Sequence, residues 1–210
     1  MQRIAVVDYG MGNVRSVVRA LEHVVEGSAE VVLSGDPAVI DAADRVVFPG
    51  QGAARDCMLS LGERSLDDAL RRAARERPFL GICMGLQVLM DHSDENEGTA
   101  CLGLYPGVVR RFDADTDGIS KIPHMGWNAV HQTRGHPLWQ GIDDGARFYF
   151  VHSYYVVPDD RTLVSATCDY GRTFAAGIAR DKVFAVQFHP EKSASDGLRL
   201  LANFVGWSDR

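Results

Sequence analysis

The chain has 210 residues, of which 46% are hydrophobic, 24% charged and 9% aromatic, the composition of an ordinary globular protein rather than a disordered or fibrous one. Its 22 basic and 28 acidic residues give a formal net charge of -6, which argues against nucleic acid or an acidic membrane surface as the main partner. No apolar run approaches the roughly 18 residues that cross a bilayer, and the start of the chain does not resemble a signal peptide. We therefore expect a cytoplasmic protein that folds as a single domain over residues 1–210.

The first half of the chain alternates short apolar runs with amphipathic stretches. Continuous apolar runs are typical of strands buried on both faces of a sheet, and the stretches between them have the 3.6-residue spacing of helices. This alternation predicts an α/β fold, a largely parallel sheet with helices on both faces. The expected strands are 4–7, 30–33, 45–48 and 79–82, and the expected helices are 14–25, with Asn13 as its cap, 66–75 and 86–90.

From about Gly98 onward the apolar runs become shorter, and Gly, Pro and Asp residues separate them. This rhythm predicts antiparallel hairpins added to the parallel sheet, closed by a helix at 198–204. The acidic stretch 91–97 is interpreted as a solvated loop. The four cysteines form no CxxC pair and no cluster of zinc-ligand spacing, so we expect neither a disulfide scaffold nor a metal site, and no cofactor.

Cys83 stands between a predicted buried strand and a predicted helix, in the segment 81–85, GICMG. Small residues on both sides allow the tight turn of a nucleophile elbow, which holds the side chain outward. The N–H groups and the dipole of a helix N-terminus favour an anion, and therefore the reactive thiolate. A buried structural cysteine between two glycines is the alternative interpretation.

A histidine suited to act on this thiol ends another predicted strand. His189 and Glu191 follow the apolar run 183–188, so the imidazole is expected at the carboxyl edge of the sheet, where open α/β sheets place their sites. Glu191 could bond one imidazole nitrogen and turn the other toward the thiol. The main rival is His152, which lacks a nearby acidic residue. The alternative is that His189 only ends a strand and Glu191 is a surface charge.

A glycine-rich turn, residues 48–52 (FPGQG), follows a third buried strand. Backbone N–H groups of such a turn can point into a pocket and stabilise the oxyanion that forms when a thiolate attacks a carbonyl. Alone it is only a turn. Combined with the elbow and the histidine–glutamate pair, it predicts a Cys-His-Glu site for acyl transfer.

Two of these segments, 81–87 (GICMGLQ) and 187–191 (QFHPE), resemble the class I (triad) glutamine amidotransferases, whose fold is flavodoxin-like. Within that family the likeness is greatest to subunits that supply ammonia to a separate cyclase in histidine biosynthesis, and it covers essentially the whole chain. The segments that carry this narrower likeness are 8–13 (DYGMGN), 123–128 (PHMGWN), 150–154 (FVHSY) and 189–193 (HPEKS).

The resemblance implies that Cys83 attacks the side-chain amide of glutamine, that His189 shuttles the proton and that Glu191 orients His189. Ammonia then leaves, and water hydrolyses the glutamyl thioester. One residue departs from the family pattern, since Gln51 stands where an aliphatic residue is usual, which leaves the conformation of the oxyanion turn open. By the same resemblance, the residues expected to hold glutamine or to lie near the oxyanion are Gly50, Gly52, Met84, Gln87, Ser153 and Tyr154.

After these features only a closing helix remains, so the chain has no room for a domain that would consume ammonia. Free ammonia is largely protonated in water and loses its nucleophilicity, so a partner chain is expected. The resemblance implies a (β/α)8-barrel cyclase subunit in a heterodimer, which forms imidazole glycerol phosphate and aminoimidazole carboxamide ribonucleotide. Residues expected near that interface are Tyr9, Asn13, Trp127 and Lys192, whose alternative roles are a turn, a helix cap, a core position and a surface lysine.

Two other classes of function remain open. An amidotransferase for another acceptor, or a hydrolase or peptidase with the same elbow, would share these residues, although the segment 123–128 favours the histidine pathway. A non-enzymatic interaction subunit with a decayed site is the other class. The presence of all three residues, Cys83, His189 and Glu191, argues against it.

Overall fold

Five parallel strands form the centre of the fold in the computed structural model, which describes residues 1–12 and 14–208. Their spatial order is β2-β1-β3-β4-β14, and each neighbouring pair is parallel. Because they run the same way, their carboxyl ends share one edge of the sheet, where sites of open α/β folds lie. Asn13, the expected cap and partner contact, lies outside the described residues. The bounds are β1 (Gln2–Val7), β2 (Ala29–Ser34), β3 (Arg45–Gly50), β4 (Phe79–Cys83) and β14 (Val183–Val186).

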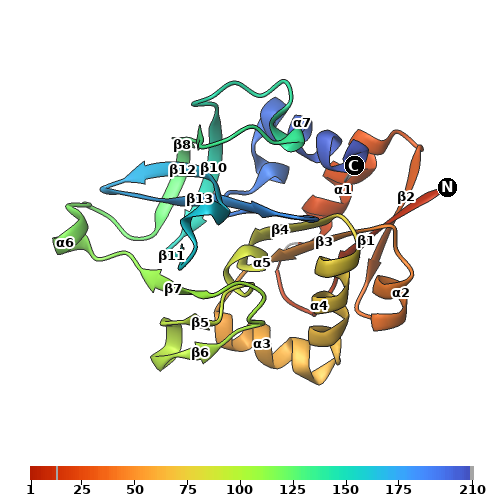
Figure 1. Ribbon diagram of the computed structural model, residues 1–210, viewed down its shortest axis with the longest axis horizontal. Coiled ribbons are helices and arrows are strands. Elements are labelled where there is room, and N and C mark those ends of the chain that lie inside the picture. Colours follow the sequence, from red (N-terminus) through yellow and green to blue (C-terminus); the bar gives the residue numbers. More distant parts are fainter. Residues whose placement is uncertain (13, 209–210) are drawn as a thin grey trace.

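Helices cover both faces of this sheet, as expected (Figure 1). Two pack together on one face, and three lie against the other. The sequence pattern does not indicate two of these helices: α2 has a capping Asp36 but only five residues, and α3 begins without a side-chain cap at Ala53. The first face carries α1 (Val14–Val25) and α7 (Ala194–Gly206), and the second carries α2 (Pro37–Asp41), α3 (Ala54–Glu63) and α4 (Leu66–Glu76).

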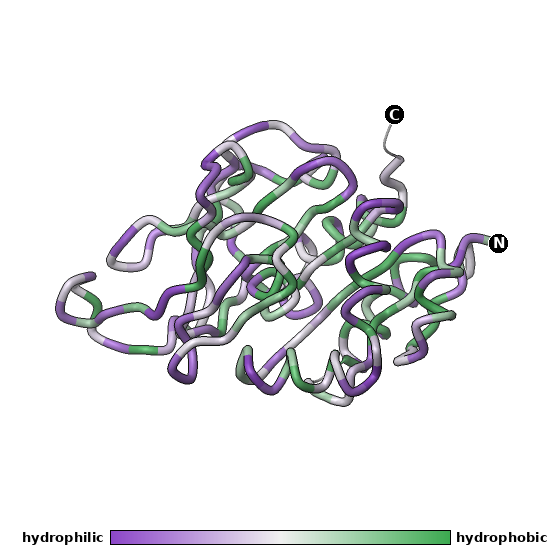
Figure 2. Tube along the Cα trace, turned by 60° about the horizontal axis from the view of Figure 1, so that its bottom comes forward, coloured by the Kyte–Doolittle hydropathy of each residue, from purple (hydrophilic) through white to green (hydrophobic). Residues whose placement is uncertain are grey.

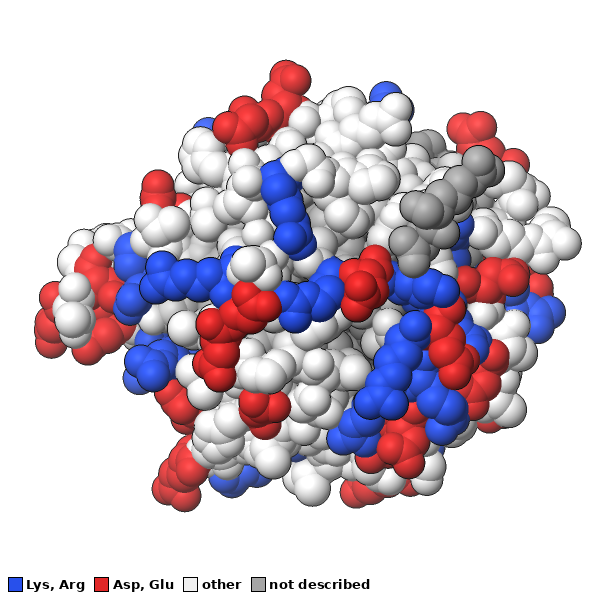
Figure 3. Space-filling view, viewed as in Figure 1, with Lys and Arg blue, Asp and Glu red and all other residues white. Residues whose placement is uncertain are grey.

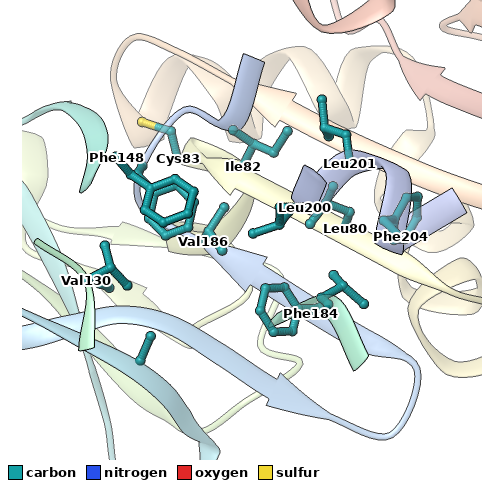
Figure 4. Packing of buried hydrophobic residues seen from close by; sticks show 14 of the residues in the cluster. Leu80, Ile82, Cys83, Val130, Phe148, Phe184, Val186, Leu200, Leu201 and Phe204 are labelled. Atoms are coloured by element: carbon teal, nitrogen blue, oxygen red, sulfur yellow. The ribbon is translucent and has the colours of Figure 1, made fainter. Parts of the chain in front are cut away.

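Two hydrophobic cores lie on opposite faces of the sheet because side chains alternate along each buried strand. In β1, Ile4 and Val6 belong to one core, whereas Ala5 and Val7 belong to the other. Figure 4 shows the first core, in which side chains of α7 pack beside β4 and β14, with Cys83 at the end of β4. Figure 2 shows the hydrophobic residues along the inner strands and the hydrophilic ones mostly in the outer turns.

The second half of the chain adds antiparallel strands beyond β14, as expected. β13 (Arg172–Arg180) pairs with β14, β12 (Val164–Tyr170) and β11 (Tyr154–Pro158), and β11 pairs with β7 (Gly107–Arg111), all antiparallel. A separate two-stranded sheet joins β8 (His124–Ala129) to β10 (Arg147–His152). The shorter elements are α5 (Met84–Gln87), β5 (His92–Ser93), η1 (Glu95–Glu97), β6 (Thr99–Ala100), α6 (Ala114–Asp117), β9 (His131–Gln132), η2 (Pro137–Trp139), η3 (Arg161–Leu163) and η4 (Pro190–Lys192).

The surface carries charges of both signs. On the face shown in Figure 3, basic and acidic side chains lie next to each other over α4 and α2, where Arg71 pairs with Asp67 and Asp68, and Arg72 pairs with Asp41. Exposed pairs of this kind contribute little to stability, about 0–1 kcal/mol each. No helix in the described part of the chain is long and apolar enough to span a membrane.

Candidate active site

Cys83 sits at the turn between β4 and α5 in a backbone conformation that a side chain rarely adopts, with φ 55 and ψ -106. Two close backbone approaches make this turn possible, because a Cβ atom on Gly85 would lie 1.9 Å from the Phe48 carbonyl oxygen, and one on Gly81 would lie 2.5 Å from the Gly85 carbonyl oxygen. The expected strand-to-helix elbow is therefore confirmed. A non-glycine residue held at positive φ is typical of an exposed nucleophile.

The helix after Cys83 is shorter than the sequence predicts. α5 has four residues, Met84–Gln87, instead of continuing to residue 90, where the chain forms turns. Peptide dipoles sum along a helix, so a single turn attracts an anion less than a long helix does. Stabilisation of a thiolate at Cys83 must therefore come mainly from neighbouring side chains.

His189 is held in one orientation by its neighbours. Its Nδ1 donates to Glu191 Oε1 over 2.8 Å, and both side chains are 2% exposed. The backbone is fixed as well, since the His189 N–H donates to the Tyr149 carbonyl over 2.9 Å and the Ser193 hydroxyl donates to the His189 carbonyl over 2.6 Å. The other ring nitrogen, Nε2, is buried and has no hydrogen-bond partner among residues 1–12 and 14–208. This nitrogen is the one free to exchange a proton.

The charge state of His189 is set by three competing influences. Burial opposes the imidazolium, but the negative charges of the Cys83 thiolate and of Glu191 outweigh it and raise the pKa of His189 to about 10. An imidazole with this pKa is protonated at neutral pH when a thiolate lies beside it. The three side chains can therefore form a thiolate–imidazolium pair backed by a carboxylate.

Cys83 lines a cavity of about 460 Å³, a volume within the usual range for small-molecule sites. Besides the pair of Cys83 and His189, the cavity lining carries the acidic side chain of Glu95 and the basic side chain of Lys192. Among the described residues, no group of His, Cys, Asp and Glu side chains is arranged to hold a metal ion. The lining comprises Gln51, Gly52, Cys83, Met84, Gln87, Glu95, Pro123, Tyr149, Val151, His152, Ser153, Tyr154, His189 and Lys192.

Most residues predicted to contact glutamine reach this cavity. Gly52, Met84, Gln87, Ser153 and Tyr154 all line it, together with the unusual Gln51. Gly50 does not line the cavity, because it is the last residue of β3 and pairs with Cys83 in the parallel ladder. The turn at 50–52 thus borders the nucleophile, with Gly52 at φ +94, a conformation that favours glycine.

His152, the rival histidine, also lines the cavity, but both of its ring nitrogens are occupied. Nδ1 lies 2.8 Å from the Tyr154 carbonyl and must donate to it, so Nε2, 2.9 Å from His124 Nδ1, must accept. Burial lowers the pKa of His152 to about 3 and that of His124 to about 4. His152 is therefore a neutral structural group and is poorly placed to exchange protons with Cys83.

The residues expected at a partner interface lie in different environments. Trp127 is 44% exposed on β8, next to Met125, which is 52% exposed, and Lys192 lies on the cavity lining. Tyr9 is 1% exposed and packs edge-on against Phe48, 5.7 Å between ring centres. The ring of Tyr9 is therefore buried beneath the turn at 50–52, and a contact of Tyr9 with a partner stays a prediction.

Glu95 is a functional candidate that the sequence pattern does not indicate. It belongs to the acidic stretch interpreted as a solvated loop, but it accepts the Ala54 N–H over 2.7 Å at the start of α3 and reaches the cavity. Asp94 and Glu97 of the same stretch remain exposed. Nothing in the local pattern separates Glu95 from these neighbours, because only the tertiary contact with α3 selects it.

The remaining cysteines are held as neutral thiols. Burial raises the pKa of Cys57 and Cys168 to about 12 and that of Cys101 to about 11. A thiol with such a pKa is unreactive at neutral pH. Among the four cysteines, only Cys83 lies on the cavity and beside a histidine–carboxylate pair.

The chain matches known proteins along nearly its full length. A family model described as glutamine amidotransferase class-I matches residues 5–206. The chain is 56% identical over 208 residues to the imidazole glycerol phosphate synthase subunit HisH of Nitrosococcus oceani, covering 99% of each chain. It is 58% identical over 212 residues to the protein of that name from Methylococcus capsulatus, covering 99% of this chain and 97% of that one.

Solved structures give a consistent result for the fold. A protein described as a glutamine amidotransferase superimposes with a TM-score of 0.72 at 18% identity, over 96% of this chain and 97% of that one. A putative GMP synthase subunit from Thermoplasma acidophilum gives a TM-score of 0.70 at 21% identity, over 98% and 93% of the two chains. At these identities the likeness supports the architecture and nothing more specific.

Proposed function

We propose, since this chain belongs to the class-I glutamine amidotransferase family, that it is the glutaminase subunit of an imidazole glycerol phosphate synthase. The observation that carries the proposal is Cys83, at a positive-φ elbow on a cavity, beside a histidine bonded to a buried glutamate. The relatives named as this subunit align over 97–99% of their own length, which supports treating residues 1–210 as one amidotransferase domain.

The site supports a two-stage acyl transfer on the side-chain amide of glutamine. The Cys83 thiolate attacks the amide carbon, and the carbonyl electrons move to oxygen. We infer that backbone N–H groups around Met84 and Gly52, which line the cavity, stabilise that oxyanion. His189 then gives its Nε2 proton to the nitrogen, and ammonia leaves a glutamyl thioester. Water attacks the thioester while His189 takes the proton of the water, and expulsion of the thiolate releases glutamate.

The cavity has the charges that a free amino acid requires. At neutral pH glutamine carries an ammonium and a carboxylate group, and Glu95 and Lys192 present the opposite charges on the lining. Ser153 and Tyr154 lie on the same lining as Gln87. We infer that Glu95 and Lys192 bind the charged groups of glutamine, and that Gln87, Ser153 and Tyr154 help to hold it with its side-chain amide toward Cys83.

The ammonia is passed to a second chain. We infer a cyclase subunit with a (β/α)8-barrel fold, which uses the ammonia in a lyase reaction that forms imidazole glycerol phosphate and aminoimidazole carboxamide ribonucleotide, in a cytoplasmic heterodimer. Met125 and Trp127 support a docking surface beside the cavity, because they are exposed and apolar on β8, whose neighbour Pro123 lines that cavity.

The proposal is tested by glutamate release from glutamine, measured for the purified chain alone and with the cyclase subunit and its ribonucleotide substrate. We expect release that depends on Cys83 and is strongly stimulated in the complex. Cys83→Ala should abolish glutamine-dependent synthesis and leave ammonia-dependent synthesis by the partner intact. Loss of both activities would identify Cys83 as a structural residue, and full activity unaffected by the cyclase would assign the chain to another acceptor.

A further inference from the structure

Gln187 contacts the sulfur of the nucleophile although it does not line the cavity. Its side chain is fully buried, at 0% exposure, directly after β14, and its backbone N–H donates to the Ala176 carbonyl over 2.9 Å. Its amide nitrogen Nε2 lies 3.6 Å from Cys83 Sγ and donates to it. The sequence segment 187–191 contains this residue, but the triad chemistry assigns it no role.

The direction of this hydrogen bond is fixed by a second glutamine. Gln87 Nε2 donates to Gln187 Oε1 over 3.1 Å and to the Tyr154 carbonyl over 3.0 Å. An amide nitrogen has two hydrogens, so both donors of Gln87 are used. Rotating the Gln187 amide would set two NH₂ groups against each other and place an oxygen against the sulfur of Cys83. Gln187 must therefore present an N–H donor to Cys83.

A buried donor of this kind suits a thiolate better than a thiol. Hydrogen bonds to ionised acceptors are roughly twice as strong as those between neutral groups, and a thiol sulfur accepts only weakly. The helix α5 has only four residues, so its N-terminus contributes little to stabilising a thiolate at Cys83. The amide of Gln187 approaches Cys83 from inside the protein, away from the cavity lining.

We propose that Gln187 is a catalytic residue whose amide N–H stabilises the Cys83 thiolate, and that Gln87 positions this amide by anchoring it to the Tyr154 carbonyl. The inference rests on the proposed function, because it assigns Gln187 to the same nucleophile. The thiolate is present in the free enzyme and forms again when water expels it from the thioester. Gln187 acts at both points without touching glutamine.

The test measures alkylation of Cys83 by iodoacetamide, followed by mass spectrometry from pH 6 to pH 10, in the wild type and in Gln187→Met. Loss of the donor should reduce the thiolate fraction at pH 7 but leave each remaining thiolate more nucleophilic. We expect alkylation about three- to tenfold slower than wild type at pH 7, and about three- to tenfold faster where the thiol is fully ionised. The two rate profiles should therefore cross.

The charges around the sulfur are otherwise the same in both proteins. The titratable groups nearest Cys83 are His189, with Glu191 behind it, and Tyr9. The same cavity lining also carries Glu95, Tyr149, His152, Tyr154 and Lys192. A crossing of the two alkylation profiles would therefore result from the loss of the Gln187 N–H donor. A rate that falls equally at every pH, or an unchanged profile, would overturn the proposal.

Two further variants guard against misfolding and nonspecific effects. Gln187→Glu keeps the acceptor for Gln87 and the shape of the side chain but sets a carboxylate against the sulfur, so its alkylation at pH 7 should be slower still. Gln132→Met is the matched control, because it removes a glutamine amide that donates to the Ile142 carbonyl over 2.9 Å in β9, and it should leave the profile unchanged.

Glutamate release in the complex separates this inference from the proposed function. In Gln187→Met we expect kcat/KM at pH 7 to fall about three- to tenfold with KM for glutamine changed less than about twofold, since Gln187 does not line the cavity. Absence of glutamate release by the wild-type complex would refute the proposed function. Normal release by the wild type and by Gln187→Met, with superimposed alkylation profiles, would refute only the role of Gln187.

Discussion

Replacing Glu191 by glutamine should separate the charge of the carboxylate from its hydrogen bond. In the native protein His189 Nδ1 lies 2.8 Å from Glu191 Oε1. The amide oxygen of the variant can still accept this hydrogen bond, but the negative charge is lost. A nearby opposite charge shifts a pKa by about 1–3 units, or about 1.4–4 kcal/mol. The pKa of His189, raised to about 10 in the native protein, should fall by that amount.

The structure adds a second cost to Glu191→Gln. Glu191 Oε2 is buried without a hydrogen-bond partner among the described residues, so the new NH₂ group takes an unpaired buried position. An unsatisfied buried donor costs about 1–3 kcal/mol. The variant should therefore unfold at lower urea concentration than the wild type, as well as lose activity.

The assay is the pH dependence of kcat/KM for glutamate release by the complex. We expect the alkaline limb of kcat/KM to move from near pH 10 to lower pH, because His189 must be protonated to expel ammonia. At pH 8, kcat/KM should fall by up to about tenfold through the smaller protonated fraction of His189. Glu63→Gln, which neutralises an exposed carboxylate at the end of α3, should change neither. An alkaline limb at the same pH, with kcat/KM within about twofold of wild type, would refute the assigned role of Glu191.

Two further predictions concern the folded state. Gly85→Ala sets a Cβ 1.9 Å from the Phe48 carbonyl oxygen and should lower the free energy of unfolding in urea by about 3 kcal/mol, the upper end of the usual cost of overpacking. Gly62→Ala, in α3 with nothing within 4 Å, should instead stabilise the protein by up to about 1 kcal/mol. Equal effects of the two substitutions would contradict the close approach. Burial lowers the pKa of His124 to about 4 and of His152 to about 3, so the unfolded chain binds more protons below pH 6.5 and stability is lost as the pH falls. The expected loss between pH 7 and pH 5 is about 2 kcal/mol for each histidine, and urea midpoints that do not fall over that range would exclude a buried neutral pair.

The sequence was most informative where a function depends on a short contiguous segment. The elbow at Cys83 and the pair of His189 and Glu191 are local patterns, and the topology of parallel strands then brings their ends to one edge. The apolar runs of the first half likewise predicted β1 and α1 closely. These features are encoded by residues that are near one another in the chain.

Features that depend on contacts between distant segments could not be predicted in the same way. Glu95 becomes part of the cavity only through its bond to Ala54, 41 positions away. The side chain of Tyr9 is buried because β3 and its turn cover it, although its loop has the composition of a surface turn. The pairing of His124 with His152 follows from the register of β8 against β10, which no local pattern specifies.

The close approach of Gly85 to Phe48 fixes the distance between the two halves of the catalytic apparatus. Phe48 belongs to β3, the strand that continues into the turn at 50–52, and Gly85 belongs to the elbow that presents Cys83. Main chain rests directly on main chain there, and Gly50 lies opposite Cys83 in the ladder. The spacing between attacking sulfur and oxyanion turn is therefore independent of side-chain size, so the neighbouring residues, Gln51 among them, are free to diverge without moving either part relative to the other.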